Sequence, residues 1–452
     1  MENKSDTKMI NKQGNREITS HGSFSGGTTD HTRIGRLKFK SSRSHRKGRV
    51  AFCGTSGLPF KHGGFEKAID ELTPHFLSEG YDCDVFTRRS TRTEFPEYDE
   101  GRRLVYVDGS KSRKLDTFKS SIETGLHLIR HRKEYSHAIW FNNANIIGIL
   151  LTALAGIPMT INTDGIEWKR PKWSLPFKAF HILSAIIVSL IGRRLVSDSI
   201  GIKDMYRKYF LRKSSFIPYG GKVPEYDTTI AEQHDILSEY DLEAGKYFLQ
   251  ITRFEPDNLP LEVARAFVES GLSQYGYKYV LIGYKDSNGY TRKIKSLDGQ
   301  KGVMILNALY DPIKIATLRH NCYCYVHGNS VGGTNPALLE AMSTCPRIMA
   351  VDTVFSREVM GDSGVYFEKN NISTCFWESL NLDDQSEYMQ ERIRAKYDWE
   401  EVAKSYIRLI EGKPSDYNPL SRYPRYETVL TPAGQRFHAK TSEEARKKEI
   451  TA

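Results

Sequence analysis

The residues best suited to do chemistry lie between Val326 and Met342, in the run VHGNSVGGTNPALLEAM. Gly332 and Gly333 let the backbone approach a ligand closely, and the amides at the start of the helix that follows favour an anion such as a phosphate. Asn335 is suited to cap that helix. Glu340 falls inside an apolar helix that we expect to be buried, so its carboxylate needs hydrogen-bond donors, which a ligand's hydroxyls could supply. The run therefore indicates a site for a ligand that carries both phosphate and hydroxyl groups.

A second run, NTDGIEWKRPKW, begins at Asn162 and follows another predicted strand. It offers carboxylates, a flat apolar side chain for a sugar ring and positive charge for a phosphate. The side chains concerned are Asp164, Glu167, Trp168, Lys169 and Arg170. Asp164 is the best candidate for orienting an acceptor, although it could equally cap the turn before Gly165. Composition alone supports a solvated basic turn above packed tryptophans equally well.

The elements that must position these runs alternate between strand and helix. From Arg49, VAFCG predicts a strand, TSGLPFKHGG a glycine-rich loop, and the next stretch a helix with apolar residues at helical spacing, before YDCDVFT returns as a strand. Such a βαβ unit implies a parallel sheet that binds its ligands at the carboxyl ends of the strands. The loop lacks GxGxxG spacing, which argues against a nicotinamide or flavin enzyme.

Four segments are expected along the 452 residues. Basic residues crowd between Arg33 and Arg49 in a segment with few apolar side chains, preceded by Ser, Thr, Gly and Asn, which predicts that residues 1–48 are a disordered tail. Residues 49–221 and 222–411 each alternate strands with helices, which predicts an α/β protein of two Rossmann-like domains. Residues 412–452 form a polar C-terminal tail.

The run GGTNPALLEAM resembles the donor-binding segment of the retaining glycosyltransferases of family 4. In that family a glycine-rich turn and a helix reading LEAM hold a nucleotide sugar, and the fold is GT-B, with two parallel sheets facing a central cleft. The form GGTNP, together with DGIEWKR, resembles a narrower subgroup that includes rhamnosyltransferases and other hexosyltransferases of surface polysaccharide biosynthesis. The resemblance covers roughly residues 49–411.

The resemblance also implies roles for individual residues. It implies that Gly63, Gly64 and Glu66 line the cleft, that Arg253 binds the phosphates and that Glu340 binds the ribose. With the two runs, the donor-binding set becomes Gly63, Gly64, Arg253, His327, Gly333, Thr334, Asn335 and Glu340. The acceptor-binding set becomes Glu66, Asp164, Glu167, Trp168, Lys169 and Arg170, and the catalytic set Asp164, Arg253 and Glu340.

Two positions depart from the family pattern. Of two family glutamates seven residues apart, the second matches Glu340 but the first falls on Gly332. A family lysine that follows the phosphate-binding arginine falls on Asn258. These departures favour an alternative function, a catalytically inactive glycosyltransferase-like protein that binds or scaffolds.

Sugar transfer from a nucleoside diphosphate builds negative charge on the leaving diphosphate. The helix start near Asn335 and the cation of Arg253 supply positive potential there, so we expect neither a metal nor another cofactor. Asp82 and Asp84 resemble a DxD pair, but they lie in a predicted strand, which makes a divalent-ion site the weaker interpretation. The resemblance further implies retention at the anomeric carbon, with a phosphate oxygen taking the proton of the acceptor.

The bulk properties restrict the partners and the location. The formal charge of +10 suggests an anionic partner, although much of the excess lies between Arg33 and Arg49. Nucleic acid is the weakest candidate, because the basic tail lacks interleaved aromatic residues. Six scattered cysteines indicate reduced thiols rather than disulfides or zinc, and the polar start predicts a cytoplasmic protein.

The most apolar stretch, Ala179 to Gly192, is too short for a confident membrane span. A buried helix is the favoured interpretation, but basic flanks also suit a helix at the inner face of a membrane. The leading function is thus a hexosyltransferase, with rhamnose and glucose as candidate sugars. It would act on a glycan or lipid-linked acceptor as a cytoplasmic enzyme, either free or peripherally bound to the membrane.

Overall fold

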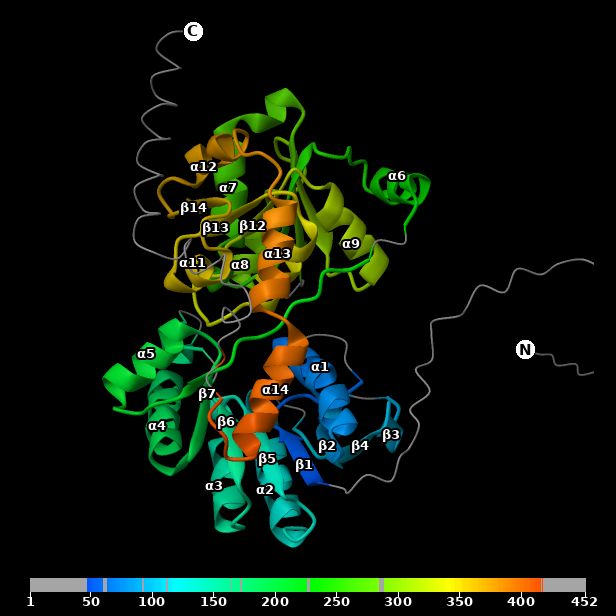
Figure 1. Cartoon of the computed structure of the whole chain (residues 1–452). Coiled ribbons are helices and arrows are strands. Elements are labelled where there is room, and N and C mark those ends of the chain that lie inside the picture. Colours follow the sequence, from blue (N-terminus) through cyan, green and yellow to red (C-terminus); the bar gives the residue numbers. More distant parts are fainter. Residues whose placement is uncertain are drawn as a thin grey trace, which may run out of the picture. The chain divides into compact units, whose positions relative to one another are not determined.

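A computed structural model describes residues 47–59, 63–91, 93–110, 113–163, 165–170, 173–225, 228–283, 288–415 and 417, all within one compact unit. Asp164, predicted to be catalytic, lies outside the described residues. So do residues 1–46 and almost all of the predicted C-terminal tail. The described part is an α/β structure with two separate sheets, as the alternating sequence pattern predicts (Figure 1).

The first sheet has eight strands within the described residues. In spatial order they are β3 (Tyr98–Asp99), β4 (Arg102–Val107), β2 (Tyr81–Arg88), β1 (Gly48–Cys53), β5 (His137–Phe141), β6 (Met159–Asn162), β7 (Arg194–Ser197) and β8 (Ser215–Phe216). Its pairings are parallel except for that of β3 with β4. Val50, Phe52 and Ile139 in the central strands are completely buried, which is why these strands are continuously apolar.

The second sheet has six strands, all parallel, in the order β11 (Val303–Asn307), β10 (Lys278–Gly283), β9 (Tyr247–Ile251), β12 (Cys324–His327), β13 (Ile348–Val351) and β14 (Val365–Phe367). The chain order reverses between β9 and β12. In open parallel sheets, ligands bind beyond the carboxyl ends of the strands at such a reversal. The segments after Ile251 and His327 therefore occupy the position expected of a binding site.

Helices connect the strands of both sheets. The first sheet is served by α1 (Gly64–Ser78), α2 (Arg113–Arg130), α3 (Ile146–Leu154), α4 (Leu175–Ile191) and α5 (Ile200–Tyr209). The second is served by α6 (Ile230–Glu239), α7 (Pro260–Ser270), α8 (Gly289–Lys295), α9 (Pro312–Asn321), α10 (Pro336–Thr344), α11 (Val354–Met360) and α12 (Ile372–Ser379). Two further helices, α13 (Ser386–Lys396) and α14 (Trp399–Ile410), follow at the end.

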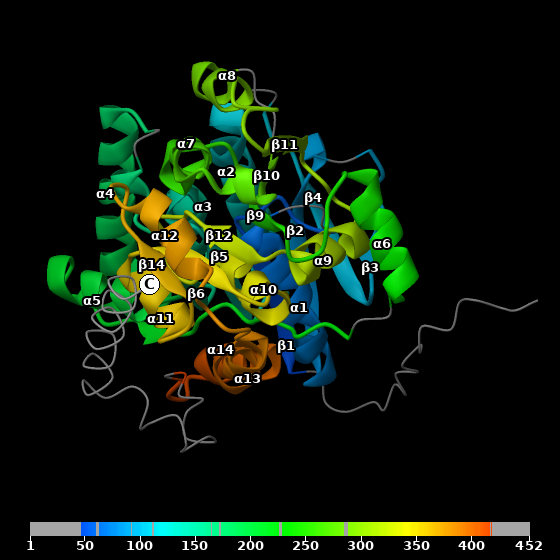
Figure 2. The same ribbon diagram turned by 90° about the horizontal axis from the view of Figure 1, so that it is seen from above.

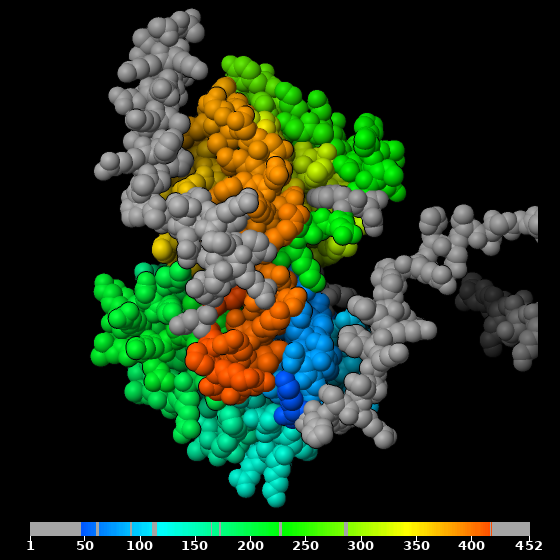
Figure 3. Space-filling view, in the orientation of Figure 1, coloured from blue at the N-terminus to red at the C-terminus, as the bar shows by residue number. Residues whose placement is uncertain are grey.

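Helix α14 returns to the first sheet. The predicted boundary at residue 411 assigns α14 to the second domain, yet it packs against α1 and β6, and the Tyr406 hydroxyl accepts a hydrogen bond from Asn162 Nδ2 at 3.0 Å. Figure 3 shows the orange surface of α14 against the blue surface of α1. Trp399, Val402 and Ala403 lie on the buried face of this amphipathic helix. The last helix therefore belongs structurally with the first half of the chain.

Two further expectations concern cysteines and membranes. All six cysteines are buried free thiols, as predicted. Of the helices that the structure describes, none combines the length and apolar character required to cross a membrane. The apolar stretch from Ala179 falls in α4, and the favoured interpretation as a buried helix is wrong for one of its faces, because Leu183 is 56% exposed and Leu190 78% exposed.

Candidate functional site

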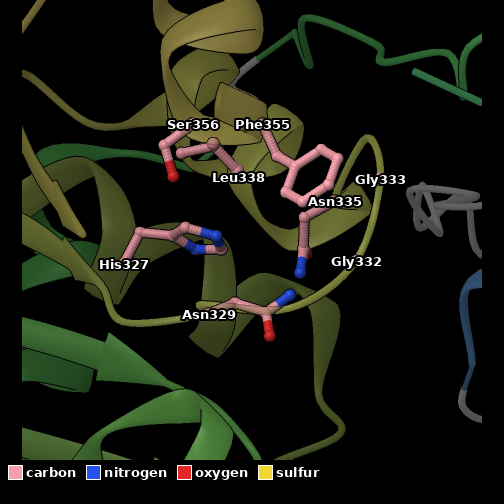
Figure 4. A pocket seen from close by; sticks show the side chains of 8 residues that line it. All are labelled: His327, Asn329, Gly332, Gly333, Asn335, Leu338, Phe355 and Ser356. Carbon is pink, nitrogen blue, oxygen red and sulfur yellow. The ribbon is translucent and has the colours of Figure 1, made fainter. Parts of the chain in front are cut away.

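A pocket lies beyond the carboxyl ends of β12 and β13, at the start of α10 (Figure 4). It is formed by His327, Asn329, Gly332, Gly333, Asn335, Leu338, Phe355 and Ser356. Asn335 caps α10 as predicted, since its Oδ1 accepts a hydrogen bond from Ala337 N at 2.9 Å. The structure thus brings His327, Gly333 and Asn335 of the predicted donor set together at one site. Their role in binding a donor stays a prediction.

The imidazole of His327 is neutral at physiological pH. It is the last residue of β12 and is only 6% exposed. Burial lowers its pKa from 6.5 to about 4, because an imidazolium without a nearby counter-charge is poorly solvated there. Figure 4 shows its ring facing the same space as the side chains of Asn329 and Asn335. A neutral ring both donates and accepts hydrogen bonds, which suits hydroxyl groups better than it suits phosphate.

Sequence reasoning missed four pocket residues, Asn329, Leu338, Phe355 and Ser356. Asn329 Oδ1 is buried with no hydrogen-bond partner in the described structure. Phe355 and Leu338 add an apolar wall, and Ser356 comes from α11, after the neighbouring strand β13. These residues lie in the segments after β12 and β13. The one feature of the sequence that could have indicated them is that each segment directly follows a predicted parallel strand. The pocket therefore pairs an unsatisfied amide oxygen and a neutral imidazole with an apolar side.

The glycine pair ahead of α10 is required by the backbone and by its neighbours. Gly332 has φ of 144°, where any side chain would be strained, so a glutamate is incompatible with this backbone conformation. A Cβ on Gly333 would overlap the carboxylate of Asp198, and the Thr334 hydroxyl donates to the Asp198 carbonyl oxygen. Asp198 follows β7, so the two halves of the chain meet at this turn.

We expect Gly333→Ala to distort the pocket and to lower donor binding at least tenfold. The added methyl group would collide with the Asp198 side chain, so the turn or the aspartate must move. In an Asp198→Ala background the same substitution should be much better tolerated. A double-mutant cycle measures this coupling. Additive effects of the two substitutions would show that the collision does not occur.

Glu340 has protein partners that the sequence did not reveal. Its Oε1 accepts from Lys67 Nζ at 2.6 Å, and its Oε2 accepts from Arg319 Nη2 at 2.7 Å. Burial acts to raise the pKa of Glu340, but the charges of Arg319 and Lys67 outweigh it and lower the pKa to about 2. The expectation of full burial is wrong, because 31% of the side chain is exposed. Ribose binding by Glu340 stays a prediction, and it would compete with Lys67.

Arg253 lies in an exposed position two residues beyond β9. A hydrogen bond within the turn fixes the backbone at Arg253, because Asn258 Nδ2 donates to the Arg253 carbonyl oxygen at 3.0 Å. Ser330 N and Oγ both donate to the Asp257 carbonyl oxygen, at 2.9 and 2.8 Å. The segments after β9 and β12 are therefore joined, which places the Arg253 turn beside the turn of the predicted donor segment. Its binding of phosphate stays a prediction.

Two charged side chains of the predicted acceptor loop, Glu167 and Arg170, form hydrogen bonds and ion pairs within the protein. Glu167 accepts from Arg170 Nε at 2.5 Å and from Trp173 Nε1 at 2.9 Å. Arg170 also pairs with the buried carboxylate of Asp257 in the other half of the chain. A Cβ on Gly165 would lie 3.0 Å from the Gly332 Cα atom, so this loop touches the glycine turn of the donor segment.

The remaining acceptor residues differ in exposure. Lys169 is exposed, and Trp168 is half-buried, with its ring edge-to-face against Phe210 at a centroid distance of 6.1 Å. Trp168 therefore offers only part of its face to a ligand. An acceptor role for this loop stays a prediction.

The start of α1 also faces the donor segment. Gly63 precedes α1 with φ of 128°, and a Cβ on Gly64 would lie 3.1 Å from Pro336 Cγ at the start of α10. Glu66 is 8% exposed, and its Oε1 accepts from Ser56 N at 2.7 Å, which closes the loop after β1. This hydrogen bond gives Glu66 a structural role, and acceptor binding by Glu66 stays a prediction.

Other candidate charges form ion pairs or helix-start contacts. Asp84 accepts from Arg103 Nη2 at 2.5 Å and from the Tyr135 hydroxyl at 2.8 Å. Across the described ranges, no cluster of three or more His, Cys, Asp and Glu side chains could hold a metal ion. Glu358 accepts from Ile200 N, at the start of α5, with both carboxylate oxygens within 3.1 Å. This carboxylate therefore lies at the start of a helix in the other half of the chain, where the helix dipole favours a negative charge.

Comparison with known proteins supports the fold. Residues 47–222 match a family model described as a domain of unknown function, DUF1972, and no curated protein matches. Sucrose-phosphate synthase from Thermosynechococcus elongatus superposes with a TM-score of 0.68 at 15% identity, over 81% of this chain and 99% of that one. HepE from Anabaena, solved with UDP and glucose, gives 0.61 at 13% identity, over 81% and 100%. A glycosyltransferase from Rickettsia africae gives 0.61 at 12%, over 82% and 99%. The chain therefore has the GT-B fold.

Proposed function

We propose that the protein is a glycosyltransferase that moves a hexose from a nucleoside-diphosphate sugar to a glycan or lipid-linked acceptor, with retention. Rhamnose and glucose are the candidate sugars. The observation that carries the proposal is the pocket at the chain reversal of the second sheet, formed around the capped start of α10. Among the GT-B neighbours, HepE was solved with UDP. Fold likeness alone would not establish activity, so the site has to supply the argument.

Groups in and near the pocket would suit this reaction. Amides at the start of α10 and the guanidinium of Arg253 would stabilise the charge that develops on the leaving diphosphate. Neutral His327 and the unsatisfied Asn329 Oδ1 would hydrogen-bond sugar hydroxyls, while Phe355 and Leu338 would cover apolar ring carbons. In a retaining transfer a phosphate oxygen takes the proton of the acceptor, so no strong base is required.

Donor binding would require the two halves of the chain to move apart locally. The closed space in the pocket is only about that of one water molecule, whereas pockets for molecules of this size are roughly 300 to 1,000 Å³. The contacts Gly165–Gly332, Thr334–Asp198 and Lys67–Glu340 lie beside it and would have to give way. Release of Lys67 would leave a Glu340 oxygen for the ribose hydroxyls, as the family resemblance implies.

The proposal is tested by turnover across a panel of nucleotide sugars. We expect slow hydrolysis of one donor by the wild type and at least a hundredfold loss in Arg253→Ala, because one phosphate-binding cation would be missing. Arg265→Ala is the matched control, since Arg265 is exposed on α7 and outside the site. Equal losses in both variants would remove Arg253 from the mechanism.

A catalytically inactive binding protein is the second candidate. The departures at Gly332 and Asn258 favour it, because each removes a charged side chain that the family carries. The same panel separates the two functions. Saturable donor binding without hydrolysis or transfer to any acceptor would support a binding protein.

A further inference from the structure

Helix α4 is apolar on the side that faces outward. Its exposed large side chains are Leu175, Ile182, Leu183, Ile186 and Leu190, with exposed fractions of 81, 39, 56, 40 and 78%. Their spacing of seven, one, three and four residues places them on one stripe of the helix. Figures 1 and 2 both show α4 at the edge of the described chain. A surface helix normally shows polar side chains on this side. We call these five residues the α4 stripe.

The opposite side of α4 buries polar side chains beside the apolar Ala185 and Val188. His181, Ser184 and Ser189 are buried against the first half of the chain, at 5, 1 and 7% exposure. His181 Nε2, Ser184 Oγ and Ser189 Oγ have no hydrogen-bond partner in the described structure. The helix therefore buries three polar side chains with small apolar ones while it exposes five large leucine and isoleucine side chains, which is unusual for a helix selected only for folding. Such an exposed apolar patch marks an interaction surface.

The chain around the α4 stripe is strongly basic. Residues 173–213 contain eight Lys or Arg and two Asp, of which Asp198 is buried. Lys178 lies beside the stripe on α4, and Arg193 follows the end of the helix in an exposed position. On α5, Arg207 and Lys208 are exposed as well. An apolar stripe beside basic side chains is complementary to an anionic lipid surface, which accepts both the apolar insertion and the charge.

We propose that the α4 stripe is a docking surface for an anionic membrane. The leucine and isoleucine side chains enter the headgroup boundary while the surrounding Lys and Arg contact lipid phosphates. A second copy of the chain fits this surface less well, since each copy would bring the same positive charge to the interface. The inference does not depend on the proposed function, although such docking would bring the site near a lipid-linked acceptor.

The test is sedimentation of the full-length protein with vesicles of phosphatidylcholine alone or mixed with phosphatidylglycerol. We expect binding to the mixed vesicles that weakens with added salt. The double variant Leu183→Glu/Ile186→Glu should bind at least tenfold more weakly. Ile230→Glu is the matched control, because Ile230 is an equally apolar and 87% exposed residue at the start of α6. The basic tail is present in every variant, so differences between variants report on α4.

Two results would overturn the proposal. One is equal vesicle binding by the wild type and the double variant, which would assign any binding to other basic segments. The other is a wild-type dimer that the double variant dissociates, measured by light scattering without lipid, which would make the α4 stripe a self-association surface. Unchanged circular dichroism of the double variant confirms that it is folded, as expected for substitutions of exposed side chains.

Discussion

Replacing Arg170 by methionine should lower the free energy of unfolding by about 3 to 5 kcal/mol. Arg170 reaches from the loop after β6 to Asp257, whose side chain is 1% exposed. The guanidinium contacts Asp257 Oδ2, and Oδ1 has no hydrogen-bond partner in the described structure, so without Arg170 the buried carboxylate loses its counter-charge. Chemical denaturation at pH 7 measures the loss.

Two further variants test whether the broken ion pair causes the loss of stability in Arg170→Met. Lys169→Met alters the exposed neighbour and should change stability by less than about 0.5 kcal/mol. Arg170→Met/Asp257→Leu removes both charges and should recover most of the loss, since an apolar pair can replace a buried ion pair. If Arg170→Met costs no more than Lys169→Met, the ion pair does not join the two halves in solution.

Glu340→Gln should lower the free energy of unfolding by about 2 to 3 kcal/mol at pH 7, and the loss should shrink in acid. The pKa of Glu340 is about 2 in the folded protein against an ordinary value of 4.5. A depressed carboxyl pKa stabilises the fold above pH 4.5, and this stabilisation disappears as the pH falls from 4.5 to 2. The difference between wild type and variant should therefore be less than half as large at pH 3 as at pH 7.

The control for Glu340 is an exposed ion pair of similar length. Glu239 pairs with Lys314 at 2.5 Å, and its side chain is 49% exposed. Because solvent screens that pair, Glu239→Gln should cost at most about 1 kcal/mol. A loss for Glu340→Gln that stays constant from pH 7 to pH 3 would show that the pairing with Arg319 and Lys67 does not set the pKa.

Local structure was predictable because it depends on near neighbours in the sequence. The alternation of apolar strands and amphipathic helices predicted both parallel sheets, and the NPALL sequence predicted the capped start of α10 at Asn335. The predicted strand that ends at His327 is β12, which lies at the reversal of chain order in the second sheet. Position therefore identified part of the pocket without any knowledge of side-chain contacts.

Contacts between distant segments were not predictable in this way. Lys67 is 273 residues from Glu340 in the sequence, and nothing in either segment indicates the pairing. Composition identified α4 as an apolar helix, but the choice between a buried and an exposed face depends on what the rest of the fold packs against it. The same holds for α14, whose amphipathic pattern predicts a buried face but not that α1 and β6 cover it.

The most direct test of the central claim follows the His327 ring by NMR during addition of nucleotide sugars. The chain has 13 histidines, and His327→Gln assigns the signal. We predict a ring that stays neutral from pH 5 to pH 8 and whose signals shift saturably with one nucleotide sugar, the donor expected to be hydrolysed. A donor that is turned over while the His327 signals stay unmoved would contradict a donor site in this pocket.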